Sequence, residues 1–504
     1  MSVGPVRIVV AGGGLAAWLA AAALGRVLDP DAYPITVVGT ADADDRLEPF
    51  GAADARLPWP ERQHAALDLD DDAVVSSCAG AFSFGLALDG WNRPDGTYFH
   101  PFSQMGAALG PVSFYHILLR LRQAGEPLRL ANFSLAALAA QAGRFTRPDR
   151  DPASVLSTCR HGLHADCHRL AALYRAEAGR HGVAVVPGHL RRVETAADGS
   201  LAALVTSDER RIEGDLFIDG SGVAARLISA VGGGDWVDWS RWLPCDRILS
   251  ANFDHDEPPQ PFSLARAHAA GWLRTLPLQD GLALVNAYST DFADQDQALR
   301  QLQELAGGRG LQNLQAHYVY FGRRGAPWQR NCIALGAAAA LIDPVGVSNL
   351  QLLRAGVDLL LQLLPGRATI SAAAAAERTE YNRRFGALLD GARDFALAHY
   401  RLNGRRGEPL WDACREVAVP ESLAYRMSLF ESRGRVALYD EEPFETDDWT
   451  NLFDEHGLIP RSYSPLADGF KLADLRVHVN MIRAVMLDAV GRMPAHAQYL
   501  GRTP

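Results

Sequence analysis

The sequence predicts an α/β protein built around a Rossmann-like sheet, and two observations support this fold class. The stretch IVVAGGGLAAWLAAAALG, residues 8–25, has the pattern of a buried strand, a glycine-rich turn and an alanine-rich helix. An apolar strand followed by a turn of small residues returns at LFIDGSG, residues 216–222, and at CIALGAAAALIDP, residues 332–344. Strands that alternate with helices in this way form a largely parallel sheet with helices on its faces.

The first turn has the spacing of a dinucleotide-binding loop. Gly12 permits the tight turn, Gly14 lets a phosphate approach the backbone, and Ala17 keeps the helix close to the strand. The free N–H groups at the start of that helix favour a pyrophosphate. An acid at the end of the second strand usually holds the ribose, but here this strand ends in Gly39. We therefore expect weak anchoring of the adenosine, which an acid introduced at position 39 should strengthen.

Composition and charge narrow the classes of protein. The chain has 504 residues, 48% of them hydrophobic and 21% charged, which is typical of a folded globular protein. A formal net charge of -10 argues against a nucleic-acid partner, because phosphates require concentrated lysine and arginine. Six cysteines without a CxxC pair suggest reduced thiols and a cytoplasmic location. No apolar run is long enough to predict a membrane span, and the oligomeric state stays open.

Three polar stretches allow alternative interpretations. In RHGLHADCHRL, residues 160–170, His164 and His168 would share one face if the segment were helical, as in some metal sites. Asp166 fits better as the residue that starts a helix, so no metal is expected. The acidic runs DLDDD, residues 68–72, and FETDDW, residues 444–449, are interpreted as solvated faces and not as catalytic carboxylates.

Longer motifs carry a family resemblance that spans about residues 6–500. In chain order they are GGGLAAW (12–18), GTYFHPF (96–102), GDLFIDGSG (214–222), GRRGAPWQRNCIALG (322–336), ARDFALAHY (392–400) and GEPLW (407–411). Together they resemble the flavin-dependent tryptophan halogenase family. The resemblance implies an FAD-binding Rossmann-like box of the flavoprotein monooxygenase or halogenase type with a largely helical substrate-binding region. It also implies a cytoplasmic enzyme that receives reduced FAD from a separate flavin reductase.

This resemblance also suggests a division of the chain. Residues 1–360 would form the FAD-binding α/β region, with inserted segments that face the substrate at about 75–160 and 235–300. Residues 361–504 would form a mainly helical region that completes the substrate site.

The catalytic positions of the family carry unusual residues here. Family members oxidise a halide with reduced flavin and oxygen, and a lysine assisted by a glutamate directs the halogen to the substrate. By the resemblance, Ser83 stands at the lysine position and Gly346 at the glutamate position, and both are expected to be non-functional. Arg274 replaces the second tryptophan of a WxWxIP motif, and Asp54 stands at an acidic position of the flavin loop. Lysine-dependent halogenation of tryptophan is therefore not expected.

The resemblance assigns further residues to binding sites. For the substrate these are His100, Phe102 and Trp449, and for the halide Ser348 and Asn349. For the cofactor they are Gly12, Gly14, Ala17, Ala52, Asp219, Gly336, Asp343 and Pro344. The expected ligand is an aromatic or indolic small molecule or peptide, because flat aromatic walls favour a flat aromatic guest.

Two functions of different classes remain. The first is a divergent oxidoreductase that uses FAD and oxygen to halogenate or hydroxylate an aromatic substrate. The second is a non-catalytic relative that binds a ligand or a partner protein. A nicotinamide-dependent dehydrogenase is disfavoured, because the strand-to-glycine junctions are spread over most of the chain and not gathered in one run.

Overall fold

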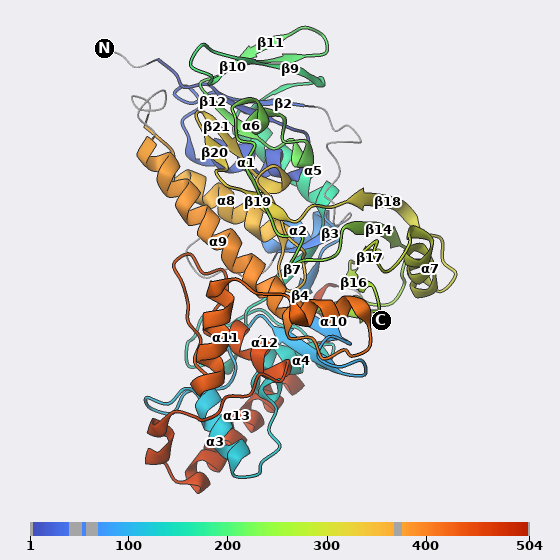
Figure 1. Ribbon diagram of the computed structural model, residues 1–504, viewed down its shortest axis with the longest axis vertical. Helices are drawn as coiled ribbons and strands as arrows, with labels where there is room; N and C mark the ends of the chain where they lie inside the picture. Colours follow the sequence, from blue (N-terminus) through green and yellow to red (C-terminus); the bar gives the residue numbers. More distant parts are fainter. Residues whose placement is uncertain (1–3, 40–52, 57–68, 367–374, 502–504) are drawn as a thin grey trace.

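The computed structural model describes residues 4–39, 53–56, 69–366 and 375–501. Ala52, one of the residues assigned to the cofactor, lies outside the described residues. The molecule is elongated in Figure 1, with the N-terminus and the first sheet toward the upper end and the C-terminal helices toward the lower end. Helix α9 (Ala375–Arg401) runs between these two ends.

The sheet at the upper end is the predicted Rossmann-like sheet. Its strand order is β20-β21-β12-β1-β2-β8, and all neighbours pair in parallel except β20 with β21. Every residue of β1 is buried because helices cover the sheet, among them α1 (Leu15–Val27) and α5 (Cys167–Arg180). The strands are β1 (Ile8–Ala11), β2 (Ile35–Val38), β8 (Ala184–Val186), β12 (Leu216–Asp219), β20 (Trp328–Gln329) and β21 (Cys332–Ala334).

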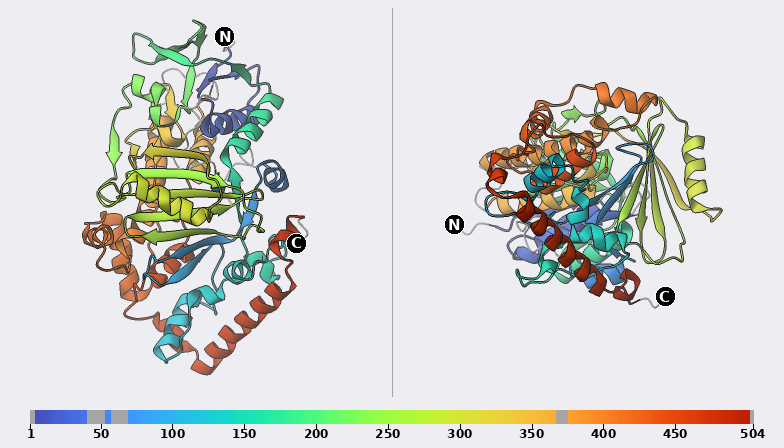
Figure 2. Two further views of the ribbon diagram at one scale, coloured as in Figure 1. Left: turned by 90° about the vertical axis from the view of Figure 1, so that its right-hand side faces the viewer. Right: turned by 90° about the horizontal axis from the view of Figure 1, so that it is seen from below.

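A second sheet of seven strands stands on one side of the molecule (Figure 2). Its order is β18-β14-β17-β16-β15-β5-β6, and helix α7 (Gln295–Ala306) packs on its outer face through Leu302 and Ala306. The strands are β5 (Gly85–Asp89), β6 (Thr97–Pro101), β14 (Arg247–Phe253), β15 (Ser263–His268), β16 (Gly271–Pro277), β17 (Leu282–Tyr288) and β18 (Gln312–Tyr318).

Three small sheets complete the β-structure that is described. They have the orders β3-β7-β4, β11-β10-β9 and β13-β19-β22. The first small sheet consists of β3 (Ala53–Arg56), β4 (Ala81–Ser83) and β7 (Gly162–Asp166). The second consists of β9 (Leu190–Thr195), β10 (Leu201–Thr206) and β11 (Arg211–Glu213). The third consists of β13 (Trp236–Asp238), β19 (Gly322–Arg324) and β22 (Ala340–Leu341).

After β22 the described chain contains helices and connecting segments and no further strand. The boundary at residue 360 stays a prediction, and α8 (Asn349–Leu363) runs across it. The other α-helices are α2 (Asp71–Ser77), α3 (Phe114–Gln123), α4 (Leu135–Gln141), α6 (Arg226–Ala230), α10 (Pro409–Glu416), α11 (Glu421–Arg433), α12 (Thr446–Glu455), α13 (Leu472–Arg492) and α14 (His496–Tyr499). Short 3₁₀ turns are η2 (Leu130–Phe133), η3 (Val155–Thr158), η4 (Gly222–Ala224), η5 (Gly336–Ala338) and η6 (Pro465–Gly469).

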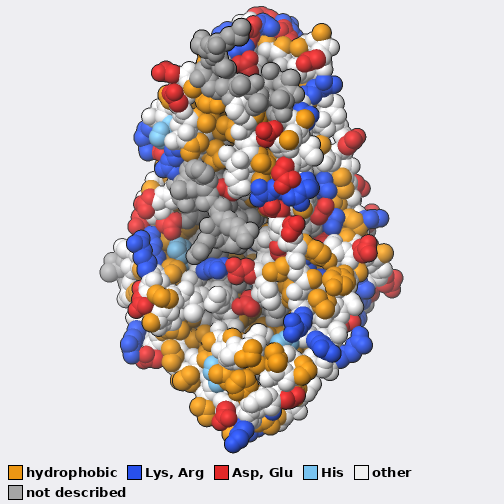
Figure 3. Space-filling view, turned by 90° about the vertical axis from the view of Figure 1, so that its left-hand side faces the viewer, with side chains coloured by type: hydrophobic (Ala, Val, Ile, Leu, Met, Phe, Trp, Pro, Cys, Tyr) orange, Lys and Arg blue, Asp and Glu red, His pale blue; other side chains and the backbone are white. Residues whose placement is uncertain are grey.

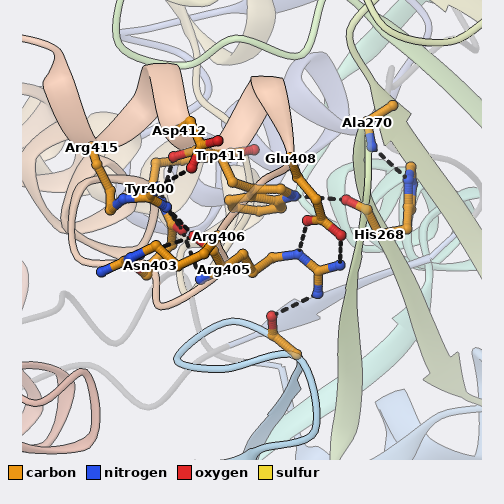
Figure 4. A network of polar contacts seen from close by, with 11 residues as sticks. His268, Ala270, Tyr400, Asn403, Arg405, Arg406, Glu408, Trp411, Asp412 and Arg415 are labelled. Atoms are coloured by element: carbon orange, nitrogen blue, oxygen red, sulfur yellow. Dashed lines mark hydrogen bonds and ion pairs between the residues drawn. The ribbon is translucent and has the colours of Figure 1, made fainter.

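A polar network fastens the segment between α9 and α10 to the seven-stranded sheet (Figure 4). The guanidinium of Arg405 pairs with Glu408 and donates to the carbonyl of Gly90 at 2.9 Å. The indole N–H of Trp411 donates to the carbonyl of His268 at 2.7 Å. These bonds cross between segments far apart in the sequence, so they fix the helical region against the sheet.

The outer surface at the lower end has an apolar component. Val477, Met481 and Val485 of α13 are exposed, and Figure 3 shows hydrophobic side chains gathered at this end of the molecule. Among the described helices, none is both long and apolar enough to cross a membrane.

Candidate functional site

The three strand-to-glycine junctions meet at one edge of the Rossmann-like sheet. Gly12 has φ +124°, and a Cβ on it would lie 2.4 Å from the carbonyl oxygen of Gly220. A Cβ on Gly220 would in turn lie 2.9 Å from the backbone nitrogen of Ala17. Gly336 follows the neighbouring strand β21 with φ +60°. The predicted order of strand, turn and helix is therefore confirmed, and Ala17 packs as closely as expected.

Gly39 explains why the second strand carries no acid. Its φ is +155°, and a Cβ on it would lie 2.8 Å from both the carbonyl carbon and the carbonyl oxygen of Gly12. Other side chains are strained in this conformation. We therefore now expect that an acid at position 39 would displace the glycine-rich turn and would not strengthen adenosine binding.

A pocket lies between the start of α1 and the start of α8. It holds about 590 Å³ of empty space, open solvent included, and its walls are mostly apolar. The lining includes Leu15, Asp54, Gly336, Asn349 and Leu350. We call it the cofactor pocket, because glycine junctions and a helix N-terminus suit a dinucleotide such as FAD.

Two acids assigned to the cofactor, Asp219 and Asp343, accept hydrogen bonds from groups of the protein itself. The Asp219 carboxylate is fully buried and accepts the backbone N–H groups of Leu227 and Ile228 at 2.8 and 2.9 Å. The Asp343 carboxylate is also fully buried and accepts the Tyr400 hydroxyl at 2.6 Å, and burial raises the pKa of Asp343 to about 6. Asp219, Asp343 and Pro344 are not among the residues that line the cofactor pocket, and neither are Gly12, Gly14 and Ala17, so direct contact of these residues with the cofactor stays a prediction.

The first turn of α8 separates the cofactor pocket from a second pocket. Its Ser348 side chain caps the helix by accepting the N–H of Gln351 at 3.1 Å. The Asp54 carboxylate, from β3, accepts the Ser348 hydroxyl at 3.3 Å and the N–H of Leu350 at 3.1 Å. Arg274 lies 3.7 Å from Asp54 and is 5% exposed, and burial lowers its pKa. Asp54 and Arg274 thus form a buried charge pair beside the turn of α8 that separates the two pockets.

The second pocket, which we call the substrate pocket, has aromatic and acidic walls. It holds about 710 Å³ of empty space, open solvent included. Strand β6 and the residues after it supply His100, Phe102 and Ser103, α8 and the loop before it supply Gly346, Val347, Ser348, Gln351 and Leu352, and the remaining lining residues are Arg160, Pro443, Phe444, Glu445, Asp447 and Asp448. Leu352 lines both pockets, so a single helical turn stands between them.

Comparison with known proteins identifies the family. A family model described as Tryptophan halogenase matches residues 7–471. The chain belongs to the tryptophan halogenase family. Tryptophan 6-halogenase SttH from Streptomyces toxytricini is 25% identical over 500 residues, with 94% of this chain and 90% of that protein covered.

Solved structures of this family match the fold closely. BrvH, a flavin-dependent halogenase from Brevundimonas sp. BAL3, has a TM-score of 0.92 and 32% identity over 99% of both chains. Xcc4156, a flavin-dependent halogenase from Xanthomonas campestris, has a TM-score of 0.91 and 31% identity over 99% of both chains. The resemblance and the α/β, Rossmann-like fold predicted from the sequence are thereby confirmed.

In this member of the halogenase family, only some of the expected site residues come together. His100, Phe102, Gly346 and Ser348 line the substrate pocket, whereas Asn349 lines the cofactor pocket. The amide of Asn349 donates to the Ile342 carbonyl at 2.9 Å, and its oxygen accepts the Ile342 N–H at 3.2 Å. Asn349 therefore holds the loop before α8 in place.

Ser83 and Trp449 do not line the substrate pocket. Ser83 is fully buried in β4 and its hydroxyl donates to the Gly85 carbonyl at 3.1 Å. Trp449 is fully buried beneath Phe444 and Phe395, with ring centroids 6.3 and 4.9 Å away. The expectation that Trp449 forms a wall of the pocket is wrong, because Phe444 takes that place.

The acidic run FETDDW was interpreted wrongly as a solvated face. Glu445, Asp447 and Asp448 line the substrate pocket at the N-terminus of α12. Glu445 and Asp448 also form a capping box for that helix. Acids at a helix start are common for this reason alone, so their position in the sequence does not indicate that they also face a pocket.

The histidine-rich segment is resolved in favour of a helix start. Asp166 caps α5 by accepting the N–H groups of His168 and Arg169, both at 2.9 Å. His164 lies before the helix in β7 and is fully buried, so it does not share a helical face with His168. Burial lowers the pKa of His164 to about 3. The geometry that suggested a metal site is therefore not formed.

Proposed function

We propose that this protein is an FAD-dependent oxidoreductase that acts on an aromatic or indolic molecule held in the substrate pocket. A separate flavin reductase would supply the reduced FAD. The observation that carries this proposal is the pair of pockets on either side of the first turn of α8, which share Leu352. An oxidant generated on one side would have only this turn to pass before it meets a bound ring.

The described residues fit both ligands. Gly336 lines the cofactor pocket, and Gly14 is partly exposed at the start of α1, where a pyrophosphate can approach the backbone. Bound FAD would supply the chemistry by which oxygen is activated for halogenation or hydroxylation. His100, Phe102 and Phe444 can stack on an aromatic ring, at roughly 0.5–1.5 kcal/mol for each aromatic pair beyond burial.

The reaction would differ from lysine-directed halogenation. Gly346 offers no carboxylate, and the Ser83 hydroxyl is bonded to Gly85. At the expected halide position, Asp54 already accepts the N–H of Leu350 and the hydroxyl of Ser348. A bound halide would have to compete with this carboxylate, so hydroxylation has to be tested beside halogenation.

A non-catalytic protein that binds a ligand or a partner is the second candidate. The residues at positions 83 and 346 favour it, because neither supplies the amine or the carboxylate that the family chemistry needs. Under this alternative the substrate pocket would still bind an aromatic molecule without converting it.

Turnover of the purified protein separates the two candidates. The reaction would contain FAD, a generic flavin reductase, NADH, oxygen and bromide, with indoles and tryptophan peptides as substrates, and the products would be identified by mass. We expect a brominated or hydroxylated indole that requires the protein, with catalase added to remove free peroxide. Flavin binding without any protein-dependent product, or no flavin binding, would contradict the proposal.

Replacing Gly14 with valine should weaken FAD binding while the fold persists. Gly14 precedes α1 with φ −88° and ψ −173°, a conformation that valine adopts without strain. The branched side chain would stand where the pyrophosphate must approach, and we expect affinity to fall at least about tenfold, or about 1.4 kcal/mol. Titration of FAD fluorescence measures this change, and circular dichroism reports folding.

A matched variant tests whether the effect is local to the turn. Gly491 lies on the exposed side of α13, and a Cβ on it meets no atom within 4 Å. Gly491→Val should therefore leave FAD affinity unchanged. Equal affinity of folded Gly14→Val and wild type would remove the glycine turn from the cofactor site.

A further inference from the structure

The substrate pocket is strongly acidic on one side. Glu445, Asp447 and Asp448 face it from the start of α12, and Arg160 is the one lysine or arginine among its described lining residues. Arg160 is already paired with Glu445, at 2.5 Å. His100 contacts Asp448, with 3.3 Å between Nε2 and Oδ1. The two aspartates therefore leave an excess of negative charge at the pocket.

Helix capping accounts for only part of this charge. Glu445 and Asp448 bind backbone N–H groups of α12 in a capping box. Asp447 is not part of the box, and it accepts the N–H of Met105 at 3.0 Å. Burial raises the pKa of Asp447 to about 6, and the charges of Asp448 and Glu445 act in the same direction. At neutral pH Asp447 is thus an ionised, partly buried carboxylate that a bound cation would stabilise.

An unsatisfied amide points to a ligand at the same pocket. Gln351 lines the pocket from α8 and is 2% exposed. Neither its Nε2 nor its Oε1 has a hydrogen-bond partner among the described residues. A buried amide without partners costs free energy, and side chains of this kind are usually satisfied by water or by a ligand. A guest with a polar ring atom would satisfy it.

We propose that the substrate pocket selects an aromatic amine, in which a flat ring bearing an N–H group lies against the aromatic wall and a cationic amine faces Asp447 and Asp448. Free carboxylates are excluded by the same acids. The inference deepens the proposed function and rests on it for the identity of the pocket. It separates an arylalkylamine from free tryptophan, whose carboxylate has no unpaired lysine or arginine to meet among the described lining residues.

Direct binding to the full-length protein tests this selection without turnover. Calorimetry would compare tryptamine, its neutral alcohol analogue tryptophol, free tryptophan and indole-3-propionate, which share one ring. A charge-assisted hydrogen bond is stronger than a neutral one, so we expect tryptamine to bind at least about tenfold more tightly than tryptophol. Indole-3-propionate should bind most weakly. Tighter binding of the carboxylates, equal binding of all four, or no binding of any would overturn the proposal.

A pair of matched variants assigns the charge effect to the pocket. Asp447→Asn should reduce the preference for tryptamine over tryptophol at least about fivefold, because about 1 kcal/mol of charge interaction is lost. Asp296 also lies in the first turn of a helix, α7, and is exposed. Asp296→Asn changes the net charge equally and should leave the preference unchanged. An equal effect of both variants would indicate only long-range electrostatics and contradict the proposal.

Binding of ligands with and without a ring N–H tests the role of Gln351 separately from the charge of the pocket. The wild type should bind indole more tightly than 1-benzothiophene, which has a similar shape but no ring N–H. Gln351→Leu should remove this difference while it preserves the preference for cations. Retention of the full indole preference in the variant would show that another group reads the ring nitrogen. These binding results stand whether or not the turnover experiment yields a product, so failures of the two proposals are distinguishable.

The affinity for tryptamine should also fall at low pH. Asp447 loses its charge as the pH falls through about 6, whereas the amine stays protonated. Asp448, Glu445, Arg160 and His100 face the same space. Titration between about pH 8 and about pH 5 should therefore show weaker binding of tryptamine but little change for tryptophol. A similar pH dependence of both ligands would contradict this assignment.

Discussion

Replacing Arg426 with methionine is expected to lower the free energy of unfolding by about 3–5 kcal/mol. Arg426 is fully buried in α11 and lies 2.5 Å from Glu442. Its guanidinium also donates to the Ala437 carbonyl at 2.9 Å and lies 3.8 Å from the centroid of the Trp449 ring. Without it, Glu442 would keep a buried negative charge whose remaining described side-chain partner is the Trp449 indole N–H at 3.2 Å.

Urea unfolding of a short variant series tests this expectation. Arg426→Met combined with Glu442→Gln should recover much of the loss, because the unpaired charge is removed together with its partner. Arg433 on the same helix is exposed, and Arg433→Met should change stability by less than about 0.5 kcal/mol. If Arg426→Met cost no more than Arg433→Met, the pair would not hold the helices together.

The free energy of unfolding that Arg426→Met loses should also depend on pH. Burial raises the pKa of Glu442 above its ordinary value, and Arg426 acts in the opposite direction. In Arg426→Met this pKa should rise further, so the folded state would bind a proton more tightly than the unfolded state. Stability of the variant would then be greatest below the unfolded pKa and would fall as the pH rises through the folded pKa. Unfolding at acid pH should show a smaller deficit than unfolding at neutral pH.

The substitution Arg426→Met should also affect the substrate pocket. Glu442 is joined to Trp449, and Phe444 between them lines the substrate pocket. Movement of Glu442 would therefore alter the pocket wall at Phe444. For folded Arg426→Met we expect weaker binding of aromatic ligands, although Arg426 does not line the pocket.

Local patterns in the sequence predicted the parts of the fold that depend on neighbouring residues. The turn at Gly12 and the cap at Asp166 are such features, because a strand, a turn and a helix start within a few residues of each other. The long family motifs extended this prediction to the whole fold. Gly39 was recognised as unusual, but its cause is the contact with Gly12, which only the folded chain reveals.

Side-chain environment was predicted less well than backbone structure. Phe444 and Trp449 lie in the same short motif, and their composition does not tell which one faces a pocket. Both rings are buried, but after the chain folds Phe444 lies at the pocket before the start of α12, whereas Trp449 lies within α12 and faces the core. Asp219 and Asp343 were assigned to the cofactor for their positions after strands, but buried backbone and hydroxyl groups use their oxygens.

Replacing Gly346 with alanine is expected to destabilise the protein and to impair the substrate pocket. Gly346 has φ +69°, and a Cβ on it would lie 2.8 Å from His399 Nε2 and 2.9 Å from Phe395 Cε1. The backbone strain costs about 1–3 kcal/mol, and overpacking costs about 1–3 kcal/mol more. Phe395 stacks on Phe444 with ring centroids 3.7 Å apart, so its displacement would reach the pocket wall.

Gly407→Ala separates the two contributions. Gly407 has a similar φ of +75°, but a Cβ on it meets no atom within 4 Å. Its alanine variant should show the backbone strain alone, so Gly346→Ala should lose a further 1–3 kcal/mol, roughly the overpacking cost.

By the same contacts, Gly346→Glu should not create a halogenase, either alone or together with Ser83→Lys, because a longer side chain meets the same two rings. Urea unfolding measures the stability of these variants, calorimetry with tryptamine measures ligand binding, and product mass detects halogenation. A stable Gly346→Glu variant that halogenates indole would show that the rings yield to the new side chain, and that the glycine itself limits the chemistry of this site.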